Sequence, residues 1–149
     1  MSTAELTLVP PPDDPRRREL WLQHAAGLVL FEDVRGYALG RLDPGLSDEA
    51  RQAARKAIDD ALYGVMMVID GVTGGLSGGD LRFELHVAAR LLRQIRGKRE
   101  VVEELDLADG DGMCMGFHGW LEGDFGPEPV ATRPPLEPPK KAPNRRRRA

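Results

Sequence analysis

Apolar residues recur with helical spacing through the first half of the chain. Asp14 precedes Pro15, an order typical of a helix start, because aspartate caps the first turn and proline fits the first helical position. We expect this helix to continue to near Leu39 and to end before the Asp43-Pro44-Gly45 break. Its apolar face is formed by Leu22, Ala25, Ala26 and Val29.

A second helix is predicted to begin after Ser47, whose side chain can cap it, with Asp48 and Glu49 placed favourably for the helix dipole. Its first half alternates apolar and polar faces at helical spacing. Residues 62–69 are apolar on all sides, which predicts that this second half is buried. Asp70-Gly71 is expected to end the helix.

Beyond a glycine-rich connection at residues 74–79, expected to be flexible, the spacing changes to the period of a strand. Apolar and polar residues alternate over residues 81–87, and a second such phase runs over residues 101–107. Gly97-Lys98 can turn the chain between them, so the pattern favours a hairpin. A helix over residues 81–96 remains an alternative, because its apolar residues also fit helical spacing.

Residues 110–126 gather the only cysteine, one of three histidines, one of two tryptophans and six glycines. Because glycine is favoured where the backbone turns sharply or approaches another group closely, this composition predicts a specified shape. We interpret the segment as a structural strand and turn. Met113, Met115 and Phe117 are expected to line the core.

These elements together predict an α+β fold, in which two N-terminal helices pack on a small antiparallel β-sheet. The 149 residues suffice for one compact domain, which we place at residues 13–126. Residues 1–12 form an expected disordered lead-in. Residues 127–149 contain seven prolines and a run of four arginines before the final Ala149, so a disordered, basic, proline-rich tail is expected.

Composition narrows the class of protein. The chain is 41% hydrophobic and 30% charged, as in soluble globular proteins, and it has no apolar run of the about 20 residues that span a membrane. The N-terminus lacks the basic and apolar regions of a signal peptide. With a single cysteine, these features favour a cytoplasmic protein.

The net charge of −3 conceals an asymmetry. Residues 1–126 carry 14 basic and 22 acidic side chains, whereas residues 127–149 carry 7 basic and 2 acidic ones. An acidic body opposes close approach to DNA, so weak contact with nucleic acid or another polyanion would fall to the tail. The candidate binding residues there are Lys140, Lys141, Arg145, Arg146, Arg147 and Arg148.

Cys114 and His118 are the candidates for a nucleophile and its base. On a straight strand they would lie about 13 Å apart at ~3.3 Å per residue, far beyond hydrogen-bonding distance. The pair therefore requires a backbone that folds back, or a different base such as His86. A buried structural cysteine is the alternative that we favour.

A metal site is a further hypothesis, with Cys114, His118 and Asp124 as ligands. Structural zinc, however, needs four ligands, and no second cysteine or histidine pair lies nearby in the sequence. No metal and no cofactor are therefore predicted.

Because each catalytic pattern fails on spacing or on ligand number, we expect a small non-catalytic protein that binds another protein through its acidic body and basic tail. Two alternatives stay open. One is a small enzyme or metal-binding protein that uses Cys114 with His118 or His86. The other is binding of a polyanion by the basic tail.

Overall fold

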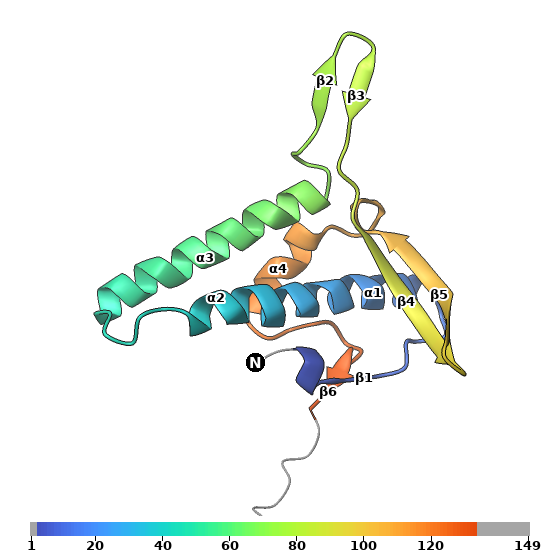
Figure 1. The fold of residues 1–149 in the computed structure, drawn as a ribbon, viewed down its shortest axis with the longest axis horizontal. Helices are drawn as coiled ribbons and strands as arrows, with labels where there is room; N and C mark the ends of the chain where they lie inside the picture. Colours follow the sequence, from blue (N-terminus) through green and yellow to red (C-terminus); the bar gives the residue numbers. More distant parts are fainter. Residues whose placement is uncertain (1–2, 134–149) are drawn as a thin grey trace, which may run out of the picture.

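A computed structural model describes residues 3–133 of the chain (Figure 1). Helix α1, Pro15–Val29, begins where the sequence predicts, and the Asp14 carboxylate accepts a hydrogen bond from the Arg17 N–H at 2.9 Å. The helix passes through a wider π-helical stretch, Leu30–Arg35, into α2, Gly36–Gly40. The predicted helix over residues 15–39 is thus confirmed, with one interruption of its regular hydrogen bonding.

Helix α3, Asp48–Ile69, is also confirmed, and its Ser47 cap accepts a hydrogen bond from the Ala50 N–H. The predicted burial of its second half on all sides is wrong. Only a stripe of this half is buried, whereas the Val65 side chain is 45% exposed. The reason is that α4, the helix it packs against most, covers one side of α3 only. The buried stripe consists of Leu62, Met66 and Ile69.

Two β-hairpins follow α3. Strand β2, Leu76–Gly78, pairs with β3, Leu81–Phe83, and β4, Ala88–Ile95, pairs with β5, Lys98–Asp106. A hairpin near Gly97 is confirmed, with positive φ at Arg96 and Gly97, and the helical alternative is wrong. The predicted pairing of 81–87 with 101–107 is also wrong, because part of the glycine-rich connection supplies the partner of β3.

Residues 113–121 are the largest departure from the sequence-based prediction. They form helix α4, Met113–Leu121, where we expected a strand. Met113 and Phe117 point into the core as predicted, but Met115 is exposed, since helical spacing places it on the opposite side. The helix is preceded by the short 3-10 turn Leu107–Asp109.

The α+β class is confirmed, although the described strands form three two-stranded antiparallel sheets rather than one. Figure 1 shows the β4–β5 hairpin crossing α1, while the β2–β3 hairpin extends away from the helices. The main core lies between α3, α4 and the 3-10 turn that follows β5. Its buried side chains are Leu62, Met66, Ile69, Leu107, Met113, Phe117 and Trp120.

The two ends of the described chain meet. After the 3-10 turn Thr3–Glu5, strand β1, Thr7–Leu8, pairs with β6, Ala131–Thr132. Val130 is buried in a second cluster with Trp21 and Leu22 of α1. Residues 127–133, the first part of the predicted tail, therefore contact α1. The rest of the predicted tail lies outside the described residues. Within residues 3–133, no helix has both the length and the apolar composition needed to cross a membrane.

Candidate functional site

Helix α4 brings Cys114 and His118 closer than a strand would, because residues four apart share one face of a helix. The Asp70 carboxylate accepts hydrogen bonds from the N–H groups of Met113 and Cys114, at 2.6 and 2.8 Å. Gly112 turns into the helix with a φ of 95°. The predicted separation of about 13 Å between Cys114 and His118, which assumed a strand, is therefore wrong.

The Cys114 thiol is nevertheless poorly suited as a nucleophile. Burial raises its pKa to about 11, and the neighbouring Asp70 carboxylate adds to the shift. The thiolate is the reactive form, so at neutral pH this cysteine is protonated. His118 packs against Tyr63, with ring centroids 5.7 Å apart, and among residues 3–133 no hydrogen bond joins it to Cys114.

His86, the other candidate base, has its own partners. Its Nδ1 lies 2.6 Å from an Asp106 oxygen, and its Nε2 lies 3.3 Å from Glu84. The hydrogen bond to Asp106, followed by that to Glu84, raises the pKa of His86. These contacts join the connection before β4 to the end of β5. The His86 ring is therefore part of an exposed ion-pair cluster.

The metal hypothesis gains no support from the described part of the chain. No group of three or more histidine, cysteine, aspartate or glutamate side chains within it is arranged to hold a metal ion. Asp124 instead accepts a hydrogen bond from the Gly126 N–H, which closes a turn after α4.

The remaining polar side chains near α4 fix it to α1. Gln23 is buried, with its carbonyl oxygen accepting from the Asp111 N–H and its amide donating to the Gly112 carbonyl. His24 accepts a hydrogen bond from the Trp120 indole. The sequence alone does not indicate these contacts, because each joins positions about 90 residues apart.

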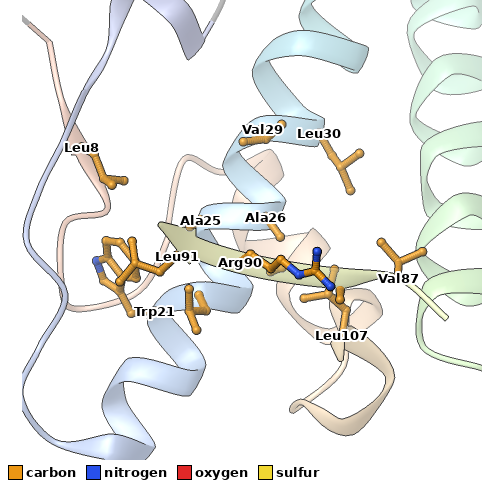
Figure 2. A pocket seen from close by; sticks show the side chains of 13 residues that line it. Leu8, Trp21, Ala25, Ala26, Val29, Leu30, Val87, Arg90, Leu91 and Leu107 are labelled. Carbon is orange, nitrogen blue, oxygen red and sulfur yellow. The ribbon is translucent and has the colours of Figure 1, made fainter. Parts of the chain in front are cut away.

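An apolar groove of about 360 Å³ lies on another side of α1, between this helix and β4. Figure 2 shows β4 passing across α1, with Val29 and Leu30 on one side of the strand. The helix contributes small residues as well as large ones, which leaves the groove open above Ala25 and Ala26. The further lining residues are Leu8, Trp21, Leu22, Val87, Ala88, Ala89, Arg90, Leu91 and Leu107.

The strand side of the groove is the edge of β4. Five consecutive residues, 87–91, line it. Alternate side chains of a strand point to opposite faces, so an unbroken run borders the groove with main-chain atoms as well as with side chains. Pairing with β5 occupies the other edge.

The hydrogen-bond register shows which main-chain groups face the groove edge. The Leu107 N–H donates to the Val87 carbonyl at 2.9 Å, which fixes the alternation in the antiparallel pair. The N–H and C=O groups of Ala88 and Arg90 therefore point away from β5. Among the described residues, no strand pairs with this edge.

No protein-family model, curated protein or solved structure matches this chain. The geometry of the groove and of its free strand edge is therefore the basis on which a function can be assigned.

The groove could not be found from the sequence, because it depends on where β4 crosses α1. One local signal was present, since the apolar face predicted for the first helix supplies Leu22, Ala25, Ala26 and Val29 to its lining. The predicted basic binding residues of the tail lie outside the described residues. They are Lys140, Lys141, Arg145, Arg146, Arg147 and Arg148.

Proposed function

We propose that this protein is a non-catalytic protein-binding module that takes up an extended, apolar segment of a partner protein as an additional strand on the free edge of β4. The observation that carries the proposal is the coincidence of an unpaired strand edge with an apolar groove. In strand addition, main-chain hydrogen bonds supply affinity, and alternate side chains supply specificity by entering pockets.

The main-chain groups of Ala88 and Arg90 are the donors and acceptors for the incoming strand. They belong to the same edge as the groove, so a segment bonded to them lies directly over α1. An unpaired edge is a ready template for another chain. The small side chains of Ala25 and Ala26 leave room for the inward-facing residues of that segment.

The chemistry of the groove selects the partner. Its lining is apolar apart from Arg90, whose guanidinium is bonded to Glu104 at 2.7 Å. The segment that fits alternates apolar residues, which face α1, with polar residues, which face solvent. Residues 134–143 of this chain contain five prolines, and proline cannot donate to a strand ladder, so this part of the tail is a poor occupant.

The raised pKa of Cys114 and the separate partners of His86 favour a binding function over the enzymatic alternative. Binding of polyanions by the basic tail stays a prediction alongside the groove. The two are separable, since tail binding would weaken steeply with added salt, whereas an apolar groove would be much less sensitive.

The probe for this function is a fluorescein-labelled heptapeptide in which valine alternates with threonine. We expect a saturable rise in its fluorescence anisotropy on titration with the full chain. A Val29→Glu variant places a charge in the groove and should weaken binding by about tenfold or more, a loss of about 1.4 kcal/mol. Because the Val29 side chain is 48% exposed, its replacement should not unfold the protein.

Two controls make the result specific. Val65→Glu alters a valine of similar exposure on α3, outside the groove, and should bind like the natural protein. A heptapeptide N-methylated at alternate amides keeps its side chains but loses the donors on one edge, and it should not bind. Equal binding of the methylated peptide, or equal binding by the Val29→Glu protein, would refute strand addition.

A further inference from the structure

The β2–β3 hairpin, residues 76–83, is an arm with one apolar face. The register pairs Leu76 with Phe83 and Gly78 with Leu81, so these four residues share a face, while Ser77 and Arg82 share the other. The apolar side chains stand in solvent, with Leu76 70%, Leu81 76% and Phe83 56% exposed. Figure 1 shows the arm extending away from the helices.

Such an arm needs a cover, because an isolated two-stranded hairpin is marginally stable in water. The arm does not fold back onto the groove of its own copy. The connection to β4, residues 84–87, contains none of the residues that favour tight turns. It is also tied to the end of β5, through the bonds of His86 to Asp106 and of Val87 to Leu107.

The geometry points to a second copy of this chain as the occupant, an inference that rests on the proposed strand addition to β4. Residues 84–90 of one copy pair antiparallel with the same residues of the other, about a two-fold axis at Val87. Residues 83–87 of each copy then lie along the groove of the other copy, and the rest of β3 continues along β4 beyond the groove. The two β4–β5 hairpins become one continuous four-stranded sheet.

The outward-facing main-chain groups of β4 are consistent with this pairing between the two copies. Pairing about Val87 places Ala88 opposite the second copy's residue 86, and Arg90 opposite residue 84. Ala88 and Arg90 are the residues whose main-chain groups point outward, so the hydrogen-bonding alternation fits this register. It sets the guanidinium of Arg90 opposite the carboxylate of Glu84, a cross-strand pair of opposite charge.

The side chains fit the same register. Phe83 falls opposite Leu91 and Leu85 opposite Ala89, on the face toward α1. Apolar and polar side chains alternate over residues 81–87, but within one copy only residues 81–83 are paired as a strand. In the dimer, strand pairing would extend through residue 87. The two-fold symmetry makes each of these contacts twice.

Sedimentation equilibrium of the full chain over a range of concentrations tests the inference. We expect the mass to rise from monomer to dimer. Leu81→Asp puts a charge on the apolar face of the arm and should shift the protein to monomer at all concentrations. Ser77→Asp adds the same charge to the opposite face and should leave the dimer intact; both positions are exposed, so neither change should affect folding.

Two results would overturn the inference. One is a natural protein that stays monomeric up to about 1 mM, the weak end of specific affinities. The other is a dimer that survives both Leu81→Asp and Val29→Glu, since its contacts would lie elsewhere. The heptapeptide titration separates the dimer inference from the proposed function. A monomeric protein that still binds the peptide would overturn the dimer but leave strand addition to β4 standing. A monomeric protein that does not bind the peptide would overturn both claims.

Discussion

The indole N–H of Trp120 donates a hydrogen bond to Nδ1 of His24 at 2.9 Å, and this bond joins α4 to the middle of α1. Because Nδ1 accepts, the ring proton of the neutral histidine resides on Nε2. Burial lowers the pKa of His24. The contact helps to hold α1, whose other side lines the groove between α1 and β4.

His24 should make stability depend on pH. Its folded pKa lies below the ordinary value of 6.5, so the unfolded chain binds more protons near that pH. The free energy of unfolding should therefore fall as pH drops below about 6.5, and should be fully retained above it. Urea denaturation of the natural protein and of His24→Asn between pH 5 and 8 measures the effect, and the variant should lose this dependence.

His86 contributes with the opposite sign. Asp106 and Glu84 raise its folded pKa, so the stability it provides is present below the unfolded pKa and is lost as pH rises through the folded one. A His86→Asn variant removes this contribution and isolates that of His24. If the His86→Asn protein were as stable at pH 5.5 as at pH 8, the neutral, buried state of His24 would be disproved.

Gly27 permits the close contact between α1 and α4. A Cβ at this position would meet the Trp120 ring at 2.4 Å. Gly27→Ala should therefore lower the free energy of unfolding by about 1–3 kcal/mol, the usual cost of overpacking. Gly64→Ala is the matched control in α3, where a Cβ meets nothing within 4 Å, and it should stabilise by about 0.5–1 kcal/mol. Equal effects at the two positions would contradict the packing.

Cys114 should react slowly with iodoacetamide. A pKa of about 11 in place of 9.0 leaves on the order of 100-fold less thiolate at pH 8 than in the unfolded chain. The alkylation rate of the folded protein should rise with pH up to at least pH 9.5, whereas the rate in urea should begin to level off near 9. A folded-state plateau near pH 7 would restore the catalytic interpretation of this cysteine.

The sequence was sufficient where structure is determined locally. The caps of α1 and α3 lie next to the helices they start, Asp14 bonding to Arg17 and Ser47 to Ala50, so both starts were predictable. Helix α4 is different, because its cap is Asp70, more than 40 residues away in sequence. Its glycines then suggested a strand, although Gly116 serves to admit the Trp120 ring.

The choice of strand partners was the second feature that the sequence did not determine. The alternation over residues 81–87 indicates an extended segment but does not state which segment pairs with it. In the structure, residues 76–78, which show no apolar alternation beyond Leu76, pair with β3, and residues 84–87 pair with no strand among those described. The groove required both this pairing and the position of β4 across α1, which only the folded chain supplies.

Amide hydrogen exchange at Ala88 and Arg90 tests strand addition most directly. Under conditions where the chain is monomeric, as for Leu81→Asp, these two amides should exchange rapidly, because they point away from β5. Saturation with the alternating heptapeptide should slow both by about tenfold or more, while the methylated peptide leaves them unchanged. Binding of the heptapeptide with no added protection at Ala88 and Arg90 would contradict the proposal that the edge of β4 is the binding site.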